Sequence, residues 1–244
     1  MSRERALASI TVSIRRLAEF QQKAAEPGPL RERLMRLRQF QSARLEAAYR
    51  DLAGDPGCAA AVRFFLTDLY GPLDYEARDR EFQRASRLLG RMLPFGVLES
   101  LVLALELQAL TLDLDVRVAQ SIAGEASLST AEYTRAYRTC GDRPARERQI
   151  ELIAAIGRSL GRVVGQPGVE LLLRMAHLPA TLAGFATLQS FIERGFDAFQ
   201  RLGDADAFMA KIERRERAFM NELFAEGDRT RSGATAVAAA AGTA

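Results

Sequence analysis

The sequence predicts an all-α protein: a single-domain helical bundle of about ten helices with a disordered C-terminal tail. Apolar residues recur at intervals of three and four along most of the chain, which is the spacing of one face of a helix. Runs that alternate apolar and polar residues, as strands do, are nearly absent. Proline, glycine and capping residues divide the chain into segments of helical length. A chain of 244 residues, 48% of them hydrophobic, is also long enough to bury a sizeable core.

Residues 1–226 are expected to form the helical domain, which opens with a helical hairpin over residues 3–53. Pro27-Gly28-Pro29 cannot continue a helix and would turn the chain between the two helices. The apolar face of the first helix consists of Leu7, Ile10, Ile14 and Leu17. The apolar face of the second consists of Leu30, Leu34, Leu37, Leu45, Ala48 and Leu52. Each helix is therefore amphipathic, with one face to bury.

Two further helices are predicted around a Gly-Pro corner. Asp55-Pro56 has the pattern of an N-cap followed by proline in the first turn, so a helix is expected from there to Tyr70. Gly71-Pro72 would end it, because glycine adopts the left-handed conformation after a helix and proline blocks further turns. Asp74 is the next expected N-cap, and residues 75–92 are expected to form the following helix.

The second half of the chain contains a long apolar helix and several shorter ones. Pro94 is expected to open the long helix, which ends near Ile122. The start signals of the next helices are Ser129 with Glu132, Asp142 with Pro144, and Asp204. Pro179 is expected to kink or divide the stretch that runs to Arg201. Within that stretch, residues 182–199 are apolar nearly all round, which predicts a buried central helix.

The last helix is expected to end near Phe224, and residues 227–244 are expected to form the tail. Apart from one valine, this Ala-rich segment has no large apolar residue. It cannot bury enough surface to fix its backbone, which predicts disorder.

Composition and charge exclude some classes of protein. No run of about 18 apolar residues is present, so no membrane span is expected, and the N-terminal segment lacks the apolar region of a secretory signal. A cytoplasmic location is expected, which fits a chain with two cysteines, since a disulfide framework would need more. The first 50 residues carry 11 basic and 5 acidic groups, whereas the remaining chain is net acidic. This asymmetry is a hint of an anionic partner at the N-terminal end.

Nucleic-acid binding is one hypothesis for that charge, and it is disfavoured. The candidate residues for an anionic partner are Arg31, Arg33, Arg36, Arg38 and Arg44. Phe40 and Tyr49 would add base stacking. However, Glu32 and Glu46 interrupt the basic run, and no helix-turn-helix signature accompanies it. A solvated arginine face is the favoured interpretation.

The segment FFLTDLYG, residues 64–71, has two interpretations. In the first, a polar cluster able to bind a cation is formed by Asp68, Tyr70, Asp74 and Asp79. In the second, the phenylalanines belong to the core, the Gly-Pro pair stops the helix, and Asp74 caps the next one. The second interpretation is favoured, because it gives each residue an ordinary role at a helix end.

The same segment resembles the signature of an uncharacterised bacterial family named for its FFLEE motif. Members of that family read FFLxDLY or FFLEELY, followed by an aspartate a few residues on. The matching residues here are Phe64, Phe65, Leu66, Asp68, Leu69, Tyr70, Gly71 and Asp74. Thr67 departs from the glutamate of the family's name. The resemblance implies a helical protein with no assigned activity.

A stripe of carboxylates runs along the long apolar helix. Glu99, Glu106 and Asp113 are spaced by seven and therefore lie on one face. Bundle proteins hold paired metals with such carboxylates together with Glu-x-x-His motifs. This chain has one histidine, His177, and the residue three before it is Arg174, so no metal and no cofactor are expected. The stripe is interpreted as facing solvent or pairing with arginines; the alternative is a buried carboxylate with a raised pKa.

His177 is expected at a helix end, where its ring would bond a backbone carbonyl. The pattern Gly157-Arg158-Ser159-Leu160-Gly161 matches the G-x-S-x-G of hydrolases, but helical spacing runs straight through it. Its two glycines are better explained as a small-residue face that lets another helix approach. A nucleophile and base formed by Cys140 and His177 has no support in the spacing, so no catalytic residue is expected.

The favoured function is that of a non-enzymatic, soluble helical binding or protein-interaction protein, whose partner is another protein or a second copy of the chain. Amphipathic helices and a flexible tail suit docking to a partner, and the sequence contains no complete set of catalytic residues. One alternative is an enzyme or carrier that binds an apolar small molecule in a pocket with a buried carboxylate. The ligand-pocket candidates are Glu99, Glu106, Asp113, Tyr70 and His177. The other alternative is a nucleic-acid-associated protein that uses the N-terminal arginines.

Overall fold

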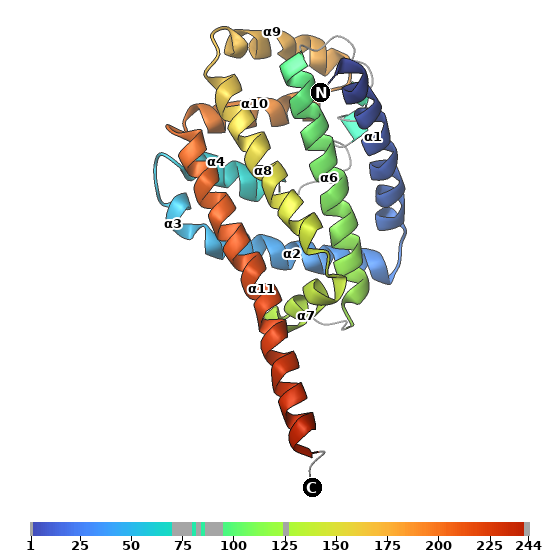
Figure 1. Ribbon diagram of the computed structural model, residues 1–244. Coiled ribbons are helices and arrows are strands. Elements are labelled where there is room, and N and C mark those ends of the chain that lie inside the picture. Colours follow the sequence, from blue (N-terminus) through green and yellow to red (C-terminus); the bar gives the residue numbers. More distant parts are fainter. Residues whose placement is uncertain (1, 70–79, 82–83, 86–94, 124–126, 242–244) are drawn as a thin grey trace.

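The computed structural model of the chain describes residues 2–69, 80–81, 84–85, 95–123 and 127–241. It describes the backbone alone at residues 23–25, 69, 95–100 and 226–241. Ten α-helices and one π-helical turn, η1, occur in these residues, and none of them forms a strand. The predicted all-α bundle is thus confirmed (Figure 1). No described helix is both long and apolar enough to cross a membrane.

The first two helices begin where the sequence predicts. α1 (Arg3–Ala25) starts after Ser2, whose side chain accepts a hydrogen bond from the backbone N–H of Arg5 (3.3 Å). α2 (Pro29–Ala48) has its proline in the first turn, where a missing N–H costs nothing. The short α3 (Arg50–Ala53) follows directly.

The N-terminal hairpin is open. α1 lies along α6 (Phe95–Ser121), and α2 crosses the bundle instead of lying beside α1 (Figure 1). The contact between α1 and α6 is a small apolar cluster formed by Ala6, Ile10, Ile14, Val102 and Leu105. The apolar face of α1 therefore meets the apolar surface of α6, which leaves α2 free to pack elsewhere.

The helix that was expected to start at Asp55-Pro56 begins later. Asp55 instead accepts a hydrogen bond on Oδ1 from the backbone N–H of Gly57 (2.9 Å), which forms a tight turn. α4 (Ala59–Phe64) starts after this turn and continues into η1 (Phe65–Leu69). The predicted stop at Gly71-Pro72 lies outside the described residues, as does most of the helix predicted over 75–92.

The long apolar helix predicted after Pro94 is α6, which packs against α1, α2, α7 and α8. α7 (Thr130–Cys140) starts as predicted, because the Ser129 side chain accepts a hydrogen bond from the backbone N–H of Glu132 (3.2 Å). Asp142 starts α8 (Arg143–Val164) in the same way, through the N–H of Ala145 (3.2 Å).

Three helices complete the bundle: α9 (Val169–Leu182), α10 (Ala186–Gln200) and α11 (Ala205–Ala241). Pro179 was expected to kink or divide this region, and it does not divide it. Pro179 lies inside α9, one turn before the helix ends at Leu182, and the break between α9 and α10 contains Gly184, with φ of 78°.

The prediction of a buried central helix over residues 182–199 is also wrong. Leu188, Phe196 and Phe199 are buried, but Leu182 is 79% exposed and Ile192 is 41% exposed. α10 is therefore an amphipathic helix at the surface of the bundle.

The core has two large clusters of buried side chains besides the α1–α6 contact. One lies between α2, α6, α7 and α11 and includes Leu37, Val118, Tyr133 and Met220. The other lies between α2, α4, α10 and α11 and includes Leu45, Phe64, Phe199 and Met209. α9, all of whose residues are described, contributes to none of the three.

The two glycines of the G-x-S-x-G pattern lie where α8 meets α11. A Cβ added at Gly157 would lie 2.3 Å from Sδ of Met209, and one at Gly161 would lie 2.4 Å from Cβ of Ala205. The prediction of a small-residue face is confirmed, since any larger side chain would separate the helices.

The end of the chain projects from the bundle. The backbone of α11 is helical to Ala241, and its C-terminal part extends beyond the other helices (Figure 1). Alanine has the highest helix propensity of all residues, which favours a helical backbone in this Ala-rich segment. Disorder of residues 227–244 in solution stays a prediction.

Candidate functional site

The most exposed apolar surface of the described residues lies on α9. It consists of Leu171, Leu172, Met175, Leu178 and Leu182, which are 62% to 79% exposed. We refer to these five residues as the α9 apolar face. None of the fourteen residues of α9 is buried, whereas leucine and methionine are among the residues most often found inside proteins.

Helical spacing places four of the five residues in one narrow stripe. Leu171, Met175, Leu178 and Leu182 follow each other at intervals of four, three and four, so they project from the same side of the helix. Leu172 widens the stripe on one edge, and Arg174 borders it on the other. This is the spacing of a helix that packs against another helix.

The opposite side of α9 rests on α10 through polar contacts. The buried side chain of Gln189 donates one amide hydrogen to the carbonyl of Leu173 (3.0 Å) and the other to Oε1 of Glu193 (2.9 Å). Glu193 also bonds Nδ1 of His177, on α9 (2.9 Å). His177 was expected to bond a backbone carbonyl at a helix end. It pairs instead with a carboxylate on the neighbouring helix.

The hydrogen bonds to Glu193 favour its ionised form. Burial acts to raise the pKa of Glu193, but the hydrogen bonds from Gln189 and His177 outweigh it and hold the pKa below its usual range. Sequence analysis missed both Gln189 and Glu193, because they lie on a different helix from His177. Together the three side chains attach α9 to α10.

α9 lies across one end of the bundle, and the C-terminal part of α11 leaves the other end (Figure 1). Besides His177, the ionisable residues of α9 are Glu170 and Arg174, which lie one turn apart and form an ion pair with each other. The α9 apolar face is therefore bordered by charges that cancel.

The phenylalanines of the FFLTDLYG segment are packing residues. The ring of Phe64 contacts Phe191 with ring centres 5.2 Å apart. A Cβ added at Gly195 would lie 2.9 Å from that Phe64 ring, so α4 and α10 meet closely here. Phe65 contacts Phe199, also on α10, at 6.1 Å.

The aspartate of this segment is a structural residue as well. Asp68 is buried in η1, where Oδ1 accepts a hydrogen bond from Nε of Arg194 (2.7 Å) and Oδ2 accepts one from the hydroxyl of Thr67 (2.9 Å). It thereby ties η1 to α10. The other predicted members of a cation site, Tyr70, Asp74 and Asp79, lie outside the described residues, as does Gly71. In the part of the chain that is described, no three acidic, histidine or cysteine side chains gather where they could hold a metal ion.

The carboxylate stripe of α6 pairs with arginines where its side chains are described. Glu106 is 39% exposed and binds Arg148 through two hydrogen bonds, of 2.8 and 3.1 Å. Asp113 pairs with Arg117 (3.4 Å). The side chain of Glu99 lies outside the described residues. The alternative of a buried carboxylate at Glu106 is wrong, because α8 supplies an arginine at the surface.

The buried carboxylate of α6 belongs to Asp115, which sequence analysis did not select. Asp115 is 5% exposed and accepts a hydrogen bond on Oδ1 from Nε2 of Gln41 (3.1 Å). Burial raises the pKa of Asp115 against the opposing effects of Gln41 and two nearby arginines. Asp115 lies three residues after Leu112 and four before Ala119, which are both buried, so it lies on the buried face of the helix. This spacing could have been read from the sequence.

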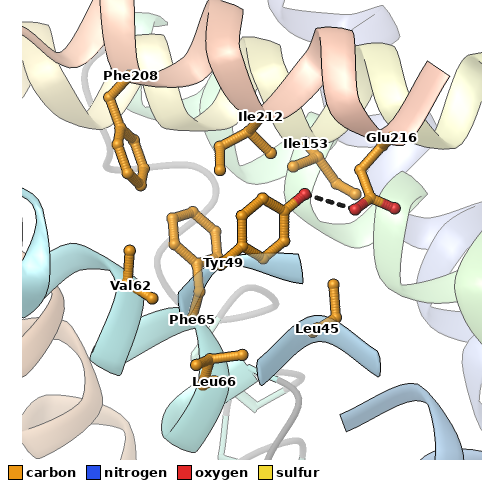
Figure 2. Close-up of a pocket in the computed structure, with 9 residues that line it drawn as sticks. All are labelled: Leu45, Tyr49, Val62, Phe65, Leu66, Ile153, Phe208, Ile212 and Glu216. Atoms are coloured by element: carbon orange, nitrogen blue, oxygen red, sulfur yellow. Dashed lines mark hydrogen bonds between the residues drawn. The ribbon is translucent and has the colours of Figure 1, made fainter. Parts of the chain in front are cut away.

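Figure 2 shows a cavity between α2, η1, α8 and α11, with a volume of about 50 Å³. Its wall is formed by Leu45, Tyr49, Val62, Phe65, Leu66, Ile153, Phe208, Ile212 and Glu216. The Tyr49 hydroxyl donates to Glu216 at one side, and Arg44 binds the same carboxylate through two hydrogen bonds, of 3.2 and 3.0 Å. Ligand sites usually enclose about 300–1,000 Å³. This cavity accepts a molecule of about the size of water, and none of the five predicted ligand-pocket residues lines it.

The N-terminal arginines lack the surroundings that base recognition needs. The Arg44 guanidinium lies 4.2 Å from the ring centre of Phe219 and is engaged by Glu216. Phe40 stacks on Tyr133 with ring centres 4.7 Å apart, and Tyr49 is buried. Neither aromatic side chain is available for stacking on a base. Among the other candidates, Arg31 and Arg38 are exposed and Arg33 and Arg36 are half-buried.

Comparison with known families gives one match, which covers most of the chain. The model of a domain of unknown function, DUF8198, matches residues 19–230. The chain belongs to the DUF8198 family. No curated protein and no solved structure matches it. The expected membership of an uncharacterised family is confirmed at this level, and the resemblance of FFLTDLYG to the FFLEE signature stays a prediction.

The DUF8198 region begins within α1 and ends within α11, so it contains α2 to α10 entirely. The α9 apolar face lies well inside it. The Asp68–Arg194 ion pair and the cavity next to Glu216 also lie inside it.

Proposed function

We propose that this DUF8198 protein is a non-enzymatic protein-interaction protein that binds an amphipathic helix of a partner molecule through the α9 apolar face. The observation that carries the proposal is the exposure of five large apolar side chains on a helix with no buried residue. Proteins that work alone rarely keep such a contiguous apolar patch in water. A helix that lays its own apolar side on this stripe would follow a common mode of recognition.

The expected energy fits a reversible complex. Complete burial of an apolar side chain contributes about 1.5–3 kcal/mol, so each residue of the face would contribute about 1–2 kcal/mol. The whole face then contributes on the order of 5–10 kcal/mol, and the apolar side of the partner helix adds a similar amount. Association costs about 4–15 kcal/mol. The gain and the cost are of similar size, so the complex is expected to be reversible.

The two alternative functions have less support. The cavity next to Glu216 is small, and Glu106 is paired with Arg148 at the surface. The stacking residues of a nucleic-acid site are packed inside the bundle. A cytoplasmic location is part of the proposal, and it is supported by the free thiols of Cys58 and Cys140, which a reducing compartment would maintain.

Site-specific photo-crosslinking in the native host tests the proposal. Leu178 is replaced by benzoylphenylalanine, the cells are irradiated, and adducts of the chain are identified by mass spectrometry. Met35 is the matched control position, because it is 59% exposed and lies on α2, far from α9 in the sequence. We expect a protein adduct at position 178 and none at position 35.

A second substitution in the same chain makes the test specific for the apolar face. Leu171→Glu places a charge about two turns from position 178 on the same stripe and should abolish the adduct. Absence of any adduct at position 178, or equal yields at positions 178 and 35, would refute the proposed function.

A further inference from the structure

We infer that the partner helix is α9 of a second copy of the chain, so that two copies pair antiparallel through their α9 apolar faces and form a homodimer. This inference rests on the proposed function and identifies its partner. It is carried by the spacing of the face, the cancelling charges beside it and its place at one end of the bundle.

The spacing of the stripe is the same in both directions. Leu171, Met175, Leu178 and Leu182 are separated by four, three and four residues. A two-fold axis that passes between residues 176 and 177 therefore places Leu171 opposite Leu182 of the second copy, and Met175 opposite Leu178 of the second copy. Interfaces between identical subunits need this self-complementarity, because a two-fold axis brings the same patch of both copies together.

The charges beside the stripe allow two identical faces to meet. Glu170 and Arg174 form an ion pair within α9, so the helix presents no net charge to its copy. Across the two-fold axis, Arg174 is level with Pro179 of the second copy, and no like charges face each other. His177 is directed to Glu193 on α10. A neutral face favours a neutral partner over an anionic membrane or a basic peptide.

The position of α9 gives both copies room. α9 lies across the end of the bundle, with the C-terminal part of α11 leaving the opposite end (Figure 1). Two copies joined end to end would therefore place their bodies on opposite sides of the α9 pair. The face covers a few hundred Å² per copy, so the total buried area falls below the about 1,200 Å² of standard specific interfaces, in the range of weak and transient complexes. We expect a reversible dimer that forms with rising concentration.

Sedimentation equilibrium of the full chain tests the dimer, over about 1 to 100 μM. The wild-type chain should shift from its monomer mass of 26.9 kDa towards twice that mass. Leu178→Arg should weaken the association at least about tenfold, since the two arginines of a dimer would face each other's apolar stripe. Met35→Arg, at the matched exposed position, should behave as wild type. Leu171→Arg provides a second test, and far-UV circular dichroism checks that each variant is folded.

Disulfide crosslinking tests the antiparallel arrangement. Leu171→Cys and Leu182→Cys are made separately in a background with Cys58→Ser and Cys140→Ser. In the antiparallel pair, residue 171 lies about 16 Å along the axis from residue 171 of the second copy, at 1.5 Å per residue. Neither variant should therefore crosslink alone, whereas an equal mixture of the two should. Efficient crosslinking of each variant alone would overturn the antiparallel arrangement.

The outcomes separate this inference from the proposed function. A chain that stays monomeric throughout, with no crosslinks in the mixture, overturns the homodimer. If position 178 then forms a photo-adduct with a different protein, the proposed function stands without the homodimer. A monomer with no adduct at all overturns both.

Discussion

Replacement of Gly161 by alanine should destabilise the bundle, because α8 and α11 leave no room for a methyl group there. The added Cβ would lie 2.4 Å from the Cβ of Ala205, whereas carbon atoms in contact are about 3.5–4 Å apart. Both side chains would be single methyl groups, which have no rotamer that relieves the clash. The first turn of α11 and the last part of α8 would therefore have to separate by about 1 Å.

The size of the effect follows from two opposing contributions. Overpacking of a close helix contact costs about 1–3 kcal/mol. Alanine in place of a helical glycine raises the free energy of unfolding by about 0.5–1 kcal/mol. Gly161→Ala should therefore lower the free energy of unfolding by roughly 0.5–2 kcal/mol, and each kcal/mol should lower Tm by about 2–4 °C in a chain of this size.

Urea unfolding followed by far-UV circular dichroism measures the change. Gly203→Ala is the control, because a Cβ at Gly203 meets no atom within 4 Å, so its stability should be unchanged or slightly raised. The double variant Gly161→Ala with Ala205→Gly removes the opposing methyl group and should recover most of the loss. Wild-type stability of Gly161→Ala, or a double variant in which the two losses simply add, would refute the reasoning.

Three further predictions concern the interior of the bundle. Arg194→Ala removes the ion-pair partner of the buried Asp68 and should lower the free energy of unfolding by about 1–2 kcal/mol in urea; a loss within error would contradict the role of Asp68 in holding η1. Val62→Ile adds a methyl group beside the cavity of about 50 Å³ and should raise the free energy of unfolding by about 0.5–1 kcal/mol, and a lower Tm would contradict this. Burial raises the pKa of Asp115, so its contribution to stability is fully present below its unfolded pKa of about 4 and is lost as pH rises through the folded pKa. Asp115→Asn should therefore lose less stability than wild type between about pH 4 and pH 8, and equal slopes in the two proteins would refute the assignment.

Helix starts were predictable where a single side chain determines them. Ser129 and Asp142 each accept a hydrogen bond from a backbone N–H three residues on, as their positions before an apolar helix indicated. Asp55 has the same sequence pattern but bonds Gly57 in a turn, because an aspartate can satisfy a nearby N–H in either structure. The local sequence does not determine which of the two structures forms.

Burial of an apolar segment depends on the whole chain. The spacing of Leu171, Met175 and Leu178 predicts an amphipathic helix, and this part of the interpretation is local. Whether another helix covers that face depends on how the remaining helices fill the core, and α9 belongs to none of the core clusters. The same limit explains the expected buried helix over residues 182–199, of which Ile192 remains exposed.

The carboxylates of α6 show how a regular interval can select the wrong face. An interval of seven connects Glu106 with Asp113, and both are paired with arginines near the surface. Asp115 lies on the opposite side of the helix, between Leu112 and Ala119, which are buried. The apolar neighbours one turn away indicated burial more reliably than the spacing among the carboxylates did.

The polar contacts beneath α9 oppose a rotation that would turn its apolar side inward. Half a turn of α9 about its own axis would bring the leucines against α10 and remove them from water. The same rotation would set the Gln189 amide and the Glu193 carboxylate against those leucines, in place of His177 and the carbonyl of Leu173. A polar group buried without a partner costs about 1–3 kcal/mol, and a charged group costs more. The polar attachment and the exposed apolar face therefore depend on each other, and a partner that covers the face gains apolar burial without disturbing the contacts that orient the helix.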